Sequence, residues 1–69
     1  MDFAEAARTV LAEEQEPLHW TVIQDLALRR GYVDPFTQGD IRRGILSALR
    51  DGVREGSLMK AGTGVYRLP

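Results

Sequence analysis

The sequence has no cysteine and a single histidine, and these two absences exclude several kinds of chemistry. Without cysteine there is no disulfide framework, no thiolate nucleophile and no cysteine-ligated zinc site. One histidine, with no carboxylates suitably spaced around it, offers neither a catalytic triad nor a set of metal ligands. We therefore expect no enzymatic activity, no cofactor and no metal.

Long apolar runs are also missing from the chain. Asp2, Glu5 and Arg8 interrupt the first segment, which argues against a signal peptide, and no stretch has the length of a membrane span. Hydrophobic residues make up 43% of the chain and charged residues 28%, as in an ordinary globular domain. We expect residues 1–69 to form one cytoplasmic domain, alone or within a longer cytosolic chain.

The charges nearly balance but are unevenly placed, and the net charge is −1. Residues 1–20 carry five acidic side chains and one arginine, whereas residues 21–69 carry eight basic and five acidic side chains. Such a division can give a small domain two faces with different partners.

Apolar residues recur at helical spacing in three segments, residues 2–14, 22–30 and 38–55. The first helix ends before Pro17, because proline disfavours helix at the residue before it. We expect Thr21 to cap the second helix, with Gln24 completing a capping box, and Gly31 to end it in the left-handed region.

The third helix follows a connector in which Asp34-Pro35 indicates a turn. Thr37 is expected to cap it, with Asp40 reaching back, and Gly56 to end it. One side of this helix is predicted to face the core, with Ile41, Ile45, Ala48, Leu49, Gly52 and Val53.

The chain closes with "SLMK" and "VYRL" on either side of "AGTG", a pattern typical of a β-hairpin. An isolated hairpin is marginally stable in water, so this one must pack against the helices. The extended segment "LHW" can add a third strand at its edge. The predicted order is helix, strand, helix, helix, strand, strand: an α+β winged helix-turn-helix, with three helices and a small antiparallel sheet.

Several segments in this order resemble the HARE-HTH family. They are "AARTVL", "EPLHWTVIQDLALRRG" and "GTGVYRL", and together they extend over nearly the whole chain. The resemblance implies a winged-helix module associated with DNA, of the kind found beside restriction-endonuclease domains, in the delta subunit of bacterial RNA polymerase and in chromatin proteins. It implies no catalytic residues, and most of the matching positions are core or turn positions.

The predicted third helix carries the candidate site, because the second helix of a helix-turn-helix enters the major groove of DNA. At 100° per residue, four side chains fall opposite its apolar side: Arg43, Ser47, Arg50 and Arg54. Arg42 lies nearer the boundary and, with Lys60 of the hairpin, is expected to contact phosphates. A basic stripe of this kind can also be only a solvated helix face.

Three aromatic side chains admit more than one role. Trp20 is expected to pack between the second helix and the hairpin, although an exposed tryptophan can stack on bases. Tyr32 and Phe36 either cover the core between the second and third helices or form an exposed patch for a protein partner.

The sequence therefore predicts a non-catalytic module that binds double-stranded DNA and serves transcription, DNA modification or restriction. The alternative is a protein-interaction module that docks on such machinery through the acidic first helix or through Tyr32 and Phe36. A homodimer through the first helix or the hairpin edge is a third possibility.

Overall fold

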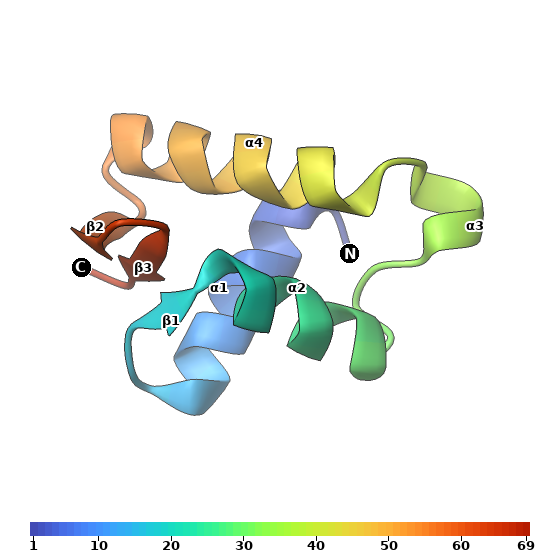
Figure 1. Ribbon diagram of the computed structural model, residues 1–69, viewed down its shortest axis with the longest axis horizontal. Helices are drawn as coiled ribbons and strands as arrows, with labels where there is room; N and C mark the ends of the chain where they lie inside the picture. Colours follow the sequence, from blue (N-terminus) through green and yellow to red (C-terminus); the bar gives the residue numbers. More distant parts are fainter.

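The computed structural model describes all residues from 1 to 69 (Figure 1). Its elements are α1 (Phe3–Glu14), β1 (Leu18–His19), α2 (Trp20–Arg29), α3 (Pro35–Gln38), α4 (Ile41–Glu55), β2 (Met59–Gly62) and β3 (Val65–Arg67). Helix α4 packs on α1 and α2, with the short α3 at its N-terminal end and the β2–β3 hairpin, here called the wing, at its C-terminal end. This is the predicted winged helix-turn-helix, with one helix more than expected.

The sheet has β3 in its centre, in the order β1-β3-β2, and both pairs of strands are antiparallel. Leu18 of β1 lies opposite Tyr66 of β3, so the prediction that this segment joins the hairpin is confirmed. The backbone N–H of Trp20 donates to the carbonyl of Gly64 at 2.9 Å. The turn of the wing is thereby tied to the first residue of α2.

Helix α2 begins one residue earlier than the predicted cap allows, and the prediction of Thr21 as N-cap is wrong. His19 is the N-cap, and its Nδ1 accepts from the backbone N–H of Thr21 at 3.3 Å. The pairing of β1 with β3 fixes the chain up to His19, and the helix starts directly where that strand ends. Gln24, the expected partner in a capping box, is half-buried, and its Oε1 has no hydrogen-bond partner.

The connector between α2 and α4 contains the additional helix, α3. Asp34 caps it by accepting from the backbone N–H of Phe36 at 2.9 Å, and Pro35 occupies the first helical position. Proline suits that position, because the N–H it lacks would have no partner inside the helix. The dipeptide predicted as a turn therefore starts a helix of four residues.

Helix α4 begins at Ile41, three residues later than predicted, and Thr37 does not cap it. Gly39 separates α3 from α4 with a φ of 72°, a conformation that no helix can continue through. Asp40 is the N-cap, accepting from the backbone N–H of Arg43 at 3.1 Å. At the other end Gly56 has a φ of 86° and ends the helix as predicted.

Thirteen buried apolar side chains from the helices and the sheet form one core. Ile41, Ile45 and Leu49 of α4 belong to it, as predicted, and Ala48 is half-buried. Val53 is exposed, against prediction, because Leu58 folds back over Gly52 and occupies the inner side of the last turn.

A polar cluster joins the C-terminal ends of α1 and α2. Arg30 contacts Glu13 at 2.8 Å and Glu14 at 2.7 Å, and the hydroxyl of Tyr32 donates to Glu13 at 2.5 Å. The hydrogen bond from Tyr32, with help from Arg30, holds the pKa of Glu13 below its usual value of 4.5. The same hydrogen bond raises the pKa of Tyr32.

We expect Tyr32→Phe to weaken the acid sensitivity of the fold. A carboxyl group with a lowered pKa in the folded state stabilises the fold above its usual pKa, and this stability is lost as the pH falls through the folded value. The free energy of unfolding of the wild type should therefore decline below pH 4.5, and that of the variant should decline less. Urea denaturation at a series of pH values measures both slopes. Tyr66→Phe is the control, and equal slopes for wild type and Tyr32→Phe would refute the assignment.

Candidate nucleic-acid interface

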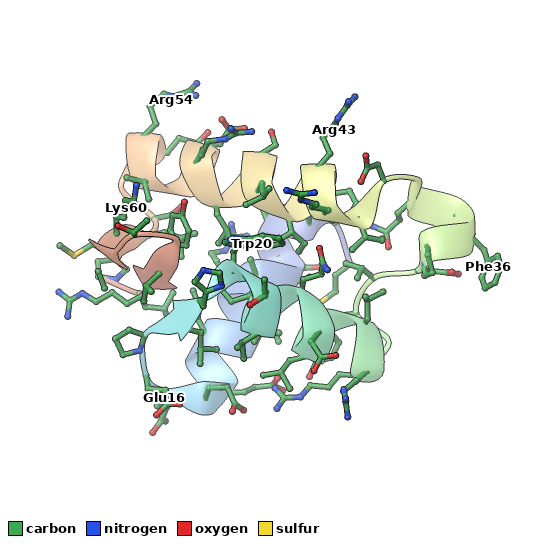
Figure 2. The ribbon with its side chains drawn as sticks, viewed as in Figure 1. Glu16, Trp20, Phe36, Arg43, Arg54 and Lys60 are labelled. Carbon is green, nitrogen blue, oxygen red and sulfur yellow. The ribbon has the colours of Figure 1, made fainter.

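The outer face of α4 presents a row of arginines to solvent. Ile41, Ile45 and Leu49 turn the opposite side into the core, which leaves this face free. Arg43 and Arg54 project from α4 away from the rest of the molecule, with side chains 84% and 77% exposed (Figure 2). Arg50 is also exposed.

Three arginines come together around a shallow hollow of about 290 Å³ on this face. Arg42, Arg43 and Arg50 line it with Leu46 and with the cap residue Asp40. The hollow thus brings Arg42, placed at the boundary by the helical arithmetic, into one group with two members of the predicted stripe. Leu46 gives the group an apolar centre that the sequence analysis did not single out.

Carboxylates lie beside two of the arginines but do not neutralise the face. Arg54 Nη2 lies 3.2 Å from Asp51 Oδ1, and Arg43 Nε lies 4.0 Å from Asp40 Oδ2. Exposed pairs of this kind contribute only about 0–1 kcal/mol, so a phosphate can displace them. Arg42 and Arg50 have no carboxylate within 4.0 Å.

Ser47 and Lys60, the other two predicted site residues, lie apart from this hollow. Ser47 is half-buried in a separate groove of about 340 Å³ between α1 and α4, where Phe3, Asp51 and Glu55 are among its neighbours. Lys60 is exposed on β2, on the wing at the C-terminal end of α4 (Figure 2). The structure therefore separates the serine from the arginines and places the lysine on a second element.

Trp20 packs between α2 and the wing, as predicted, and it also contacts α4. Its ring is half-buried, and its Cδ1 lies 3.2 Å from where a side-chain carbon of Gly64 would be. The guanidinium carbon of Arg42 lies 5.5 Å from the centroid of the Trp20 ring. Sequence reasoning missed this contact, because only the packing of α4 on α2 brings the two residues together.

His19 has the hydrogen-bonded role expected of it, with Nδ1 2.8 Å from Thr21 Oγ1. The structure gathers no group of three or more His, Cys, Asp or Glu side chains that could hold a metal ion. None of the helices has both the length and the apolar character needed to cross a bilayer.

Two features lie away from the arginines. The largest hollow, about 380 Å³, lies between the end of α1 and β3, and the apolar side chains of Leu11 and Leu68 line much of it. We do not place the site there, because its charged groups are only Glu16 and Arg67 and it is open to solvent. Phe36 on α3 is 95% exposed, so it does not cover the core, whereas Tyr32 packs against it.

Comparison with known proteins identifies the family. The model of the HARE-HTH family, the helix-turn-helix domain named for ASXL and restriction endonuclease among its members, matches residues 1–68. No curated protein and no solved structure matches the chain. The family match extends over both helices of the helix-turn-helix and the whole wing, in agreement with the fold. The chain therefore belongs to the HARE-HTH family of helix-turn-helix domains.

Proposed function

We propose that this domain binds double-stranded DNA by placing α4 in the major groove. The observation that supports the proposal is the group of Arg42, Arg43 and Arg50 around one hollow on the exposed face of α4. A helix of this diameter fits the major groove, and the planar guanidinium group can grip phosphate oxygens or the edge of guanine. Leu46, in the centre of the group, is suited to contact the methyl group of thymine.

The wing provides a second, weaker contact in this proposal. Lys60 is exposed and has no ion-pair partner, so its ammonium group is free to contact a phosphate. Arg54 lies at the end of α4 nearest the wing and extends the basic surface toward it. The residues in contact with DNA would then be Arg42, Arg43, Arg50, Arg54 and Lys60, with Ser47 at the edge.

The domain acts in this proposal as a non-catalytic cytoplasmic module that directs a transcription, DNA-modification or restriction activity to DNA. A single copy with so few phosphate contacts binds weakly, with a dissociation constant of ~10⁻⁴–10⁻⁶ M at physiological salt. A second copy or a tethered neighbouring domain would raise the effective concentration and make the binding useful.

The test is fluorescence anisotropy of a labelled random-sequence duplex, titrated with the domain at several salt concentrations. Three phosphate contacts predict a slope of about −2.7 for the logarithm of the association constant against the logarithm of the salt concentration. Absence of binding at low salt and high protein concentration would refute the proposal.

Phe36 supports one rival function, a protein-interaction module. A phenylalanine that is 95% exposed, on a helix of four residues at the end of the molecule away from the wing, is unusual for a side chain without a partner (Figure 2). Retention on a heparin column at low salt distinguishes the two functions, because a concentrated basic face binds heparin despite a net charge of −1.

A further inference from the structure

The contact between Trp20 and Arg42 has a consequence for the proposed DNA interface. Arg42 is the arginine of the hollow that lies against an aromatic ring, with its guanidinium carbon 5.5 Å from the ring centroid. A cation above the face of a tryptophan is attracted by the ring electrons. The stack therefore restricts the Arg42 side chain to one orientation before any ligand arrives.

The Trp20 ring is itself held in place by three neighbours. Its backbone N–H donates to the carbonyl of Gly64 at 2.9 Å, and its ring lies beside His19 with the two centroids 5.7 Å apart. A side chain on Gly64 would approach Trp20 Cδ1 to 3.2 Å, so the backbone of the wing closes over the edge of the indole. The start of α2, the turn of the wing and α4 therefore meet at this ring.

The other arginines of the face are held differently. Arg43 and Arg54 each have an aspartate neighbour on α4 itself, and Arg50 has neither a carboxylate partner nor an aromatic one. Arg42 lies about 100° around the helix from Ile41, on the side of α4 toward α2, whereas Arg43 lies about 200° around. In a groove, Arg43 would point toward the bases and Arg42 toward one wall, which is formed by the phosphates of one strand.

We propose that Trp20 and Arg42 form a preorganised phosphate contact, in which Trp20 is the positioning residue and Arg42 binds the DNA backbone. This inference rests on the proposed function and adds a specific role for Trp20. Holding the guanidinium in place lowers the conformational entropy that binding would otherwise cost. Because it contacts a phosphate, the pair fixes the position of α4 along the groove without distinguishing one base sequence from another.

The inference is tested by the salt dependence of duplex binding in two single variants and their combination. Arg42→Gln removes one phosphate contact, so its salt slope should be smaller in magnitude by about 0.9. Trp20→Leu leaves every charge in place, so its slope should equal that of the wild type while its affinity falls about five-fold. The double variant should bind no more weakly than Arg42→Gln, because Trp20 acts only through Arg42.

Two controls separate positioning from folding. Phe36→Leu makes the same kind of change on α3, away from the interface, and should bind as the wild type does. If Trp20→Leu unfolds, Arg42→Lys replaces it, since this change keeps the charge but removes the planar group. Its slope should remain that of the wild type while its affinity falls.

The intrinsic fluorescence of Trp20, the only tryptophan, gives an independent readout. Unlabelled duplex should shift the emission of the wild type, and should leave that of Arg42→Gln unshifted at a matched fraction bound. If the wild type binds no duplex, the proposed function fails and this inference fails with it. If the wild type binds while folded Trp20→Leu and Arg42→Lys keep full affinity, only the inference about the pair is overturned.

Discussion

The double substitution R43E/R50E is expected to abolish binding to duplex DNA. Both side chains line the hollow on α4, and reversing two charges replaces two attractive contacts with two repulsive ones. Affinity should fall at least 100-fold below a wild-type dissociation constant of ~10⁻⁴–10⁻⁶ M, which places it beyond detection. Anisotropy at low salt, where the wild type binds most tightly, is the appropriate measurement.

The helix itself should tolerate these changes. Position 43 lies in the first turn of α4, where a negative charge interacts favourably with the helix dipole. A glutamate at position 50 precedes Arg54 by four residues, the spacing and order that favour an ion pair. The circular dichroism spectrum and the unfolding midpoint should therefore remain close to those of the wild type.

The matched control for this experiment is R29E/R67E, which changes the net charge by the same amount at exposed positions on α2 and β3. Neither residue lines the hollow on α4. We expect this variant to lose only a small part of its affinity. Equal loss in the two double variants would mean that net charge, and not the face of α4, governs the binding.

Leu49→Ala is expected to have the largest effect on stability. Leu49 is fully buried at the centre of α4, where this helix packs on α1 and α2. Truncating a buried leucine to alanine costs about 2–5 kcal/mol, because apolar contacts are lost and a cavity remains. A domain of this size has a total stability of only ~3–10 kcal/mol, so a substantial fraction of the variant should be unfolded at 37 °C.

Urea denaturation followed by circular dichroism measures this loss. Leu28→Ala is the control, because it is the same chemical change at a leucine of α2 that is 37% exposed. It should cost less than about 1 kcal/mol, since much of that side chain is already in water. Similar losses for the two variants would mean that Leu49 does not hold α4 on the other helices as the structure indicates.

Local sequence signals predicted the elements that depend on local chemistry. Gly31 and Gly56 end their helices with positive φ, as expected, because glycine adopts that conformation without steric cost. The helical arithmetic placed Arg43, Arg50 and Arg54 on the exposed side of α4, since Ile41 and Leu49 fix its buried side. The arrangement of three helical segments and a hairpin was sufficient to indicate the fold.

Features set by competition between neighbouring signals were predicted less well. Thr21 and Thr37 are good capping residues by type, yet His19 and Asp40 cap the helices instead. At α2 the pairing of β1 with β3 decides where the helix starts, and no sequence window around Thr21 contains that information. At α4, Asp40 directly precedes the first helical residue, whereas Gly39 ends the helical run that includes Thr37.

The strand pairing of Leu18 with Tyr66 also determines the order in which the protein can fold during synthesis. The partner of β1 is made roughly 50 residues after β1 itself, a delay of about 2–10 s on the ribosome. Until then Leu18 and the first turn of α2 lack the strand that covers them, and the amide of Trp20 lacks its acceptor on Gly64. The sheet therefore closes last, and the final residues of the wing complete the junction between α2 and α4.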